Sequence, residues 1–141
     1  MKKIISTIFG LTLAMMILLT SGFASTKAYA ANDSAKYLKG ARFLTALHGQ
    51  DENDNEIILA LYEKNGTNIA YLNDGISHVC TSYTDKSVNV TNLGTVERVT
   101  IGDTLFFDFF MADDIPCLLC EDGNIYACEY LTAYEMNQLI S

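Results

Sequence analysis

Four cysteines are the residues whose type and spacing point most directly to chemistry. Cys117, Cys120 and Cys128 fall within the segment IPCLLCEDGNIYACEY at residues 115–130, and Cys80 stands apart from them. Paired cysteines form disulfides in exported proteins, and elsewhere they bind zinc or carry out redox reactions. Four cysteines allow three disulfide connectivities, so the local structure has to decide among them.

The same segment predicts a β-hairpin that turns at residues 122–123, Asp-Gly, because this pair between apolar runs favours a two-residue type I′ turn. In that register Cys117 faces Cys128, and directly opposed Cβ atoms lie about 4.5–5.5 Å apart. Cys120 then lies on the other face of its strand and is left to pair with Cys80. We therefore predict the disulfides Cys117–Cys128 and Cys80–Cys120. The prediction depends on the register, because a slip of one residue reverses the face of every side chain.

Zinc binding by Cys80, Cys117, Cys120 and Cys128 is the alternative, because Cys-x-x-Cys is a common zinc half-site. Such a site needs a tight turn at residues 118–119, and two leucines are poor turn residues. A thioredoxin-type site needs the pair at a helix N-terminus, whereas here the pair lies in a predicted strand. Disulfides are favoured, and no cofactor is predicted.

Asp108 is the one candidate catalytic residue, because it lies within the apolar run TLFFDFFM at residues 104–111. It fits a charge that suppresses aggregation, a charge on an edge strand, or a carboxylate with a raised pKa in an apolar cavity. The first two interpretations are favoured, so an exported enzyme that uses Asp108 is an alternative hypothesis. The chain has two histidines and lacks the Gly-x-Ser-x-Gly and His-Glu-x-x-His motifs of common hydrolases.

An acidic loop at residues 50–56 superficially resembles the start of a calcium-binding loop. Asp51, Asn53 and Asn55 occupy alternate positions there. The glycine and glutamate that an EF-hand requires at positions six and twelve are absent. The pattern predicts a solvated hairpin loop.

The N-terminal 30 residues have the composition of a secretory signal peptide. Lys2 and Lys3 precede an uncharged apolar run at residues 4–19, and Ala28 and Ala30 supply the small residues of a cleavage site. We expect cleavage after Ala30 and secretion. Residues 31–40 are then a polar lead-in, and residues 41–141 form a single disulfide-braced domain.

Hairpin signals repeat through the mature chain. With residues 65–66, Asn-Gly, as a two-residue turn, Tyr62 faces Ile69. With residues 74–75, Asp-Gly, as the next turn, Ile69 faces Cys80. This alternation places Cys80 on a strand face lined by Ile and Tyr, which is a core environment.

Eight or nine short strands joined by tight turns predict an all-β, mostly antiparallel meander. A small barrel is the first choice and a two-sheet sandwich the second. A short C-terminal helix is predicted to begin with a capping box formed by Thr132 and Glu135. Its apolar side chains Met136, Leu139 and Ile140 can then pack against the sheet.

The negative net charge of the mature chain argues against several classes of binding partner. The signal segment holds Lys2, Lys3 and Lys27 and no acidic residue, so its removal lowers the net charge from −8 to −11. This charge opposes binding to nucleic acids and to anionic membranes. We predict a secreted binding module, such as an inhibitor, adhesin or small-ligand carrier, with a protein or small-molecule partner that is preferably basic.

Overall fold

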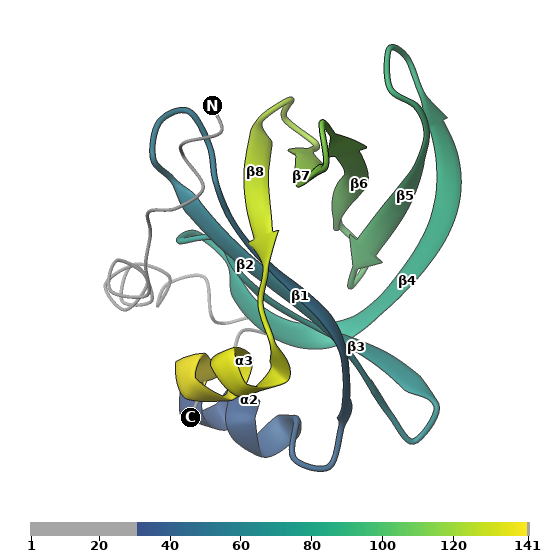
Figure 1. Cartoon of the computed structure of the whole chain (residues 1–141). Coiled ribbons are helices and arrows are strands. Elements are labelled where there is room, and N and C mark those ends of the chain that lie inside the picture. The colour runs from purple at the N-terminus through teal and green to yellow at the C-terminus, as the bar shows by residue number, and fades with distance from the viewer. Residues whose placement is uncertain (1–30, 141) are drawn as a thin grey trace.

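The computed structural model describes residues 31–140, so the predicted signal peptide and its cleavage after Ala30 lie outside the described part. Strands make up most of this part, and a short helix precedes and follows them (Figure 1). In chain order the elements are α2 (Ala31–Tyr37), β1 (Arg42–Gln50), β2 (Glu56–Lys64), β3 (Thr67–Asn73), β4 (His78–Val90), β5 (Gly94–Ile101), β6 (Leu105–Ala112), β7 (Ile115–Cys120), β8 (Ile125–Tyr130) and α3 (Ala133–Ile140).

The strands form a closed, up-and-down antiparallel barrel. Each strand pairs with the next, and β1 pairs with β8 to close the sheet. Closure removes the unpaired edges that a two-sheet sandwich would leave. The prediction of an all-β meander with a short C-terminal helix is therefore confirmed, and the barrel is the architecture that forms.

Alternation along the strands divides the apolar side chains between two cores. The inner core fills the barrel and includes Leu59, Leu72, Val99, Phe107 and Leu118. Its side chains pack across the middle of the barrel, so the barrel is a solid core there.

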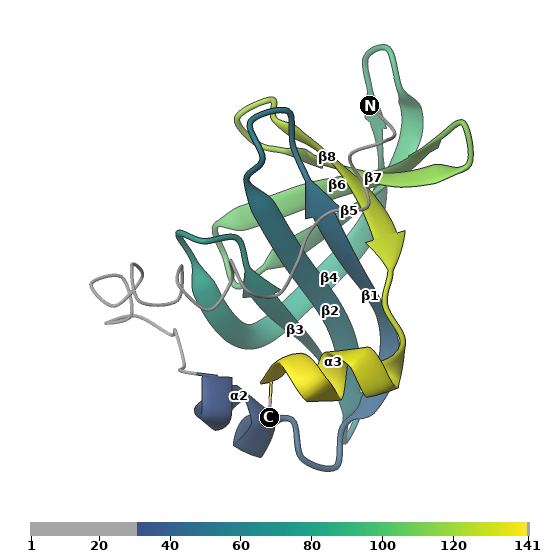
Figure 2. The same ribbon diagram turned by 60° about the vertical axis from the view of Figure 1, so that its left-hand side comes forward.

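The second core lies outside the barrel wall, between β1–β4 and the two helices (Figure 2). Met136 and Ile140 of α3 are buried there, as predicted for the C-terminal helix. The capping box also forms: the Thr132 amide donates to Glu135 Oε1 at 2.8 Å, and the Glu135 amide donates to Thr132 Oγ1 at 3.1 Å. These bonds satisfy amides that the first helical turn leaves unpaired.

Of the two predicted registers in β2–β4, the first is confirmed and the second differs. In β2–β3, Tyr62 lies opposite Ile69, as predicted. In β3–β4 the loop is longer, because Asn73 pairs with His78, so Ile69 faces Ser82 rather than Cys80. The shift is two residues, which preserves the face, and Cys80 still packs with Tyr62 and Ile69.

β4 is one continuous strand of 13 residues, so the barrel has eight strands, the lower of the two numbers expected.

The β7–β8 register differs from the prediction by one residue. Cys117 lies opposite Ala127, not Cys128. The Gly123 amide donates to the Cys120 carbonyl at 3.0 Å, and the Cys120 amide donates to the Asn124 carbonyl at 2.8 Å, so the loop is longer than two residues. Only Gly123 in this loop has a positive φ, of 93°. This turn leaves the aspartate before it in an ordinary conformation, whereas a type I′ turn would force both residues to positive φ.

Candidate functional site

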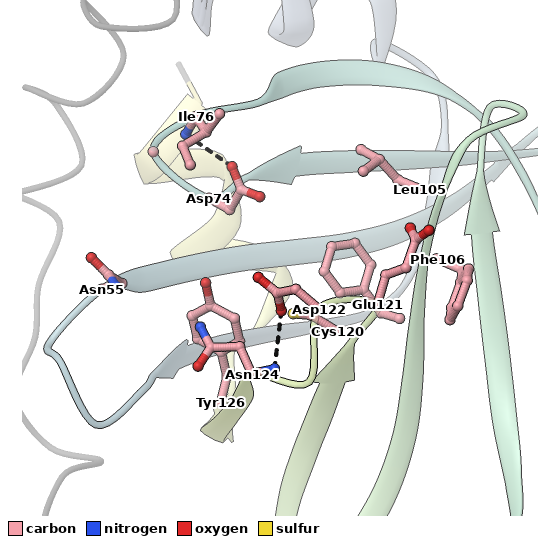
Figure 3. A pocket seen from close by; sticks show the side chains of 12 residues that line it. Asn55, Asp74, Ile76, Leu105, Phe106, Cys120, Glu121, Asp122, Asn124 and Tyr126 are labelled. Atoms are coloured by element: carbon pink, nitrogen blue, oxygen red, sulfur yellow. Dashed lines mark hydrogen bonds between the residues drawn. The ribbon is translucent and has the colours of Figure 1, made fainter. Parts of the chain in front are cut away.

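A cavity of about 700 Å³ lies at one mouth of the barrel. Alternate hairpins of a meander meet at the same end, and the β1–β2, β3–β4 and β7–β8 loops surround this mouth together with the start of β6 (Figure 3). The volume falls within the range of about 300–1,000 Å³ typical of ligand pockets.

The floor of the mouth is apolar and its rim is acidic. Leu105, Phe107 and Tyr126 form part of the floor and pack against the inner core. Asp74, Glu121 and Asp122 carry carboxylates around the rim, together with two asparagines. Among the described residues, no lysine or arginine lines this cavity. The mouth thus combines an apolar surface with uncompensated negative charge.

The rim carboxylates are held in place by their own loops. Asp74 Oδ1 accepts hydrogen bonds from the amides of Ile76 at 2.9 Å and Ser77 at 2.6 Å. Asp122 Oδ1 accepts from the Asn124 amide at 3.0 Å (Figure 3). These Asx turns explain locally why the two loops adopt their shape. In each case the hydrogen bonds use one carboxylate oxygen, and among the described residues the second oxygen accepts none and remains available at the mouth.

Asp51 joins two of the loops from behind the rim. Its Oδ1 accepts from the amides of Asn53 at 2.8 Å and Asn55 at 2.9 Å. Its Oδ2 accepts from Asn55 Nδ2 at 3.0 Å and from Asn124 Nδ2, on the β7–β8 loop, at 2.7 Å. Burial alone would raise the pKa of Asp51, but these hydrogen bonds outweigh burial and hold the pKa below its ordinary value.

The negative charge of the rim contributes to raised pKa values of two side chains inside the mouth. Burial, and after it the charges of Asp122, Asp74 and Asp51, together raise the pKa of the Cys120 thiol to about 12. Burial also raises the pKa of the Tyr126 hydroxyl, and the same three aspartates add to the shift. A negative field that opposes ionisation of a thiol and a phenol favours a bound cation.

Asp108 lies on the outer face of β6, away from the barrel interior. Arg98 Nε donates to Asp108 Oδ1 at 2.7 Å, and Arg98 Nη2 donates to Oδ2 at 2.9 Å. The guanidinium also lies 4.0 Å from the centre of the Phe106 ring. β6 is paired on both sides, so the edge-strand interpretation is wrong. Asp108 is also one half of a bidentate ion pair, so its surroundings are not purely apolar, and a catalytic role for it stays a hypothesis.

The four cysteines are separate free thiols in this structure. Cys80 lies in the outer core beneath the helices, whereas Cys120 packs against the inner core, so the barrel wall separates them. Cys128 belongs to the inner core, and Cys117 alternates with the inward-facing Leu118. The geometric basis for both predicted disulfides is therefore absent, and we expect free thiols in their place, which thiol chemistry can test.

The same distribution contradicts the alternative of a zinc site built by all four cysteines. Within residues 31–140, no group of three or more His, Cys, Asp or Glu side chains is arranged to hold a metal ion. The calcium-like spacing in the β1–β2 loop has another explanation, because both oxygens of Asp51 accept hydrogen bonds from asparagines.

The rim residues did not emerge as a site from the sequence. Asp74 and Asp122 were recognised there only as turn residues. The signal that could have found them is the order of the hairpins: acidic turns in the first, third and seventh connections of a meander lie at the same end of a barrel. The sequence predicts the barrel, and the order of its strands then places these acidic turns around one mouth.

Comparisons of the chain with protein-family models, with curated proteins and with solved structures give no match. In the described part of the chain, neither helix has the length and apolar character needed to cross a bilayer. What the protein binds therefore has to be inferred from its own residues.

Proposed function

We propose that the mature chain is an extracellular binding protein that holds a small, partly apolar, positively charged ligand in the mouth of its barrel. The observation that carries this proposal is the acidic rim of Asp74, Glu121 and Asp122 above an apolar floor. Pockets that bind small molecules combine mainly apolar walls with a few placed polar groups. Of the three kinds of binding module expected from the sequence, a small-ligand carrier uses this concave site most directly.

Charge supports a cationic ligand over a neutral or anionic one. The rim carboxylates have no cationic neighbour among the residues that line the cavity. The mature net charge of −11 extends the negative field beyond the mouth and speeds the approach of cations. A ligand that inserts an aromatic or aliphatic group and leaves its charge at the rim would satisfy both surfaces.

The first test is a fluorescence titration with the cationic dye thioflavin T, compared with its uncharged analogue that lacks the ring N-methyl group. Asp74→Asn with Asp122→Asn removes two rim charges, and Asn Oδ1 can still accept the turn hydrogen bonds. Because an exposed charge pair contributes about 0.2–1 kcal/mol, we expect the double variant to raise the Kd of the dye roughly two- to thirtyfold.

The matched control is Asp113→Asn with Asp114→Asn in the β6–β7 turn at the other end of the barrel. Both aspartates have positive φ, of 53° and 69°, which asparagine also tolerates, so this variant loses the same charge without strain. It should bind the dye as the wild type does. Equal binding of the uncharged analogue, or an equal loss in both double variants, would refute a cation site at the mouth.

A further inference from the structure

A second cavity, of about 270 Å³, lies at the opposite end of the barrel. It shares no lining residue with the mouth described above. On β2, the buried Ile57 lies between Asn55 of the mouth and Leu59 of the second cavity. On β8, the buried Cys128 lies between Tyr126 and Tyr130 in the same way. The packed middle of the barrel therefore separates the two cavities.

Apolar side chains form most of the wall of this second cavity. Leu61, Val99, Phe109 and Leu118 line it from four strands and pack in or against the inner core. This wall can accommodate a compact hydrocarbon group, and the small volume excludes a ligand that would fill the larger mouth.

Two carboxylates interrupt the apolar wall. Asp85 on β4 and Glu97 on β5 both line the cavity. Asp85 lies opposite Val99, two residues from Glu97 on the neighbouring strand, and such diagonal neighbours lie about 7–8 Å apart. This separation lets one bound ammonium group contact both carboxylates.

Neither carboxylate is neutralised within the protein. Among the described residues, no lysine or arginine forms an ion pair with Asp85 or Glu97. The hydrogen bond found for Glu97 comes from Ser87 Oγ at 3.4 Å, which leaves acceptor capacity on the carboxylate. Asp85 is exposed and Glu97 half-buried, so water solvates both carboxylates, and each keeps acceptor capacity for a cationic group on a ligand that reaches the apolar wall.

We propose that this second cavity binds a compact organic cation, a primary ammonium on a short apolar group, with Asp85 and Glu97 holding the charge. Leu61, Val99 and Phe109 contact the apolar group. The site is independent of the one proposed at the acidic mouth, and it takes a smaller ligand.

The experiment is an NMR titration of the mature protein with phenethylammonium, compared with its uncharged analogue phenethyl alcohol. Binding should shift the resonances of Leu61, Val99 and Phe109, and these shifts should saturate independently of any shift at Leu105 and Tyr126 in the acidic mouth. Because ion pairs with exposed carboxylates are weak, phenethyl alcohol, which lacks the charge, should bind roughly two- to thirtyfold more weakly.

Asp85→Asn with Glu97→Gln should raise the Kd of phenethylammonium roughly two- to thirtyfold, because both charges are lost and the shape is kept. Asp74→Asn with Asp122→Asn removes equal charge at the other mouth and should leave this Kd unchanged. Asp85 is exposed and Glu97 half-buried, so the variant should fold, and its dispersed amide spectrum checks this directly.

Three results would overturn the proposal. They are no binding up to about 10 mM, equal affinity for the alcohol, and shifts confined to the acidic mouth. The last result would leave the site at the mouth standing while removing the second one, so failure of the two proposals is distinguishable.

Discussion

Asp51 shows how one side chain can organise several loops at the mouth. Its two oxygens accept four hydrogen bonds, three from its own loop and one from Asn124 on the β7–β8 loop. Asp51 is 2 % exposed, so water cannot readily replace these partners. Asp51 therefore connects strands β1 and β8, which close the barrel, through the loops at their ends.

Replacing Asp51 with alanine should lower the free energy of unfolding by about 2–3 kcal/mol, because buried donors lose their acceptor. Urea unfolding at neutral pH measures this change. Glu52→Ala, at the exposed neighbouring position, is the control and should change the free energy by no more than about 0.5 kcal/mol. A similar, small effect of both substitutions would contradict the role assigned to Asp51.

The lowered pKa of Asp51 predicts the sign of a pH effect. A carboxyl whose pKa is lower in the folded state stabilises the fold above its unfolded pKa, about 3.9 for aspartate. That stabilisation disappears as the pH falls through the folded-state pKa. The gap in unfolding free energy between wild type and Asp51→Asn should therefore be full at neutral pH and shrink below about pH 4. A gap independent of pH would contradict this prediction.

Among the elements, the seam between β1 and β8 is the one that converts a sheet into a barrel. Gly49 lies opposite Cys128 in this seam. A Cβ at position 49 would lie 2.5 Å from Cys128 Sγ and 3.1 Å from Tyr126 Cβ. Glycine is thus required here because the side chains of β8 occupy the space that any other residue would need.

Gly49→Ala should destabilise the protein by about 1–3 kcal/mol through overpacking at this seam. The same substitution in a Cys128→Ala background should cost less, because the closest atom has been removed. Thermal or urea unfolding of the four proteins in this double-mutant cycle measures the coupling. An equal cost in both backgrounds would show that Cys128 is not the source of the conflict.

Hairpin loops decided which side chains meet across the strands. In β3–β4 the register moved by two residues, and Cys80 kept its predicted environment with Tyr62. In β7–β8 it moved by one, and Cys117 lost its predicted partner Cys128. The period of two along a strand explains the different consequences.

For the whole molecule, the largest difference between the sequence-based prediction and the structure concerns the cysteines. Two disulfides were predicted, and all four cysteines are free in the structure. In the strand registers no two cysteines lie directly opposite each other: Cys117 faces Ala127 and Phe110, Cys80 faces Tyr71, and Cys128 faces Gly49. A bridge between Cys80 and Cys120 would also have to pass through the barrel wall. We therefore expect four thiols in the folded protein.

The intact mass of the secreted protein, measured without reductant, checks this expectation together with cleavage after Ala30. Two disulfides would lower the mass by four hydrogens. Burial raises the pKa of Cys80 and Cys120 to about 12, so few thiolates exist at neutral pH and alkylation of the folded protein should be slow. After unfolding in urea, all four cysteines should react, whereas four unreactive cysteines would restore the disulfide hypothesis.

The sequence by itself determined the local features of this protein. The Asn-Gly turn at residues 65–66, the capping box of Thr132 and Glu135, and the alternation of Leu105 and Phe107 with Asp108 all follow from neighbouring residues. Such features depend on φ/ψ preferences and on the period of a strand or helix, which are properties of short segments. Together they were sufficient to predict an all-β meander.

Only the tertiary structure determines which side chains come together at the two proposed binding sites. Closure of β1 onto β8 brings Asp74, Asp122 and Asp51 to one mouth although they are far apart in the chain. It also turns Asp85 and Glu97 toward a common cavity, and pairs Asp108 with Arg98 on the outside. Contacts of this kind depend on loop length, register and ring closure, and a change of one residue in any of these reverses which side chains face inward.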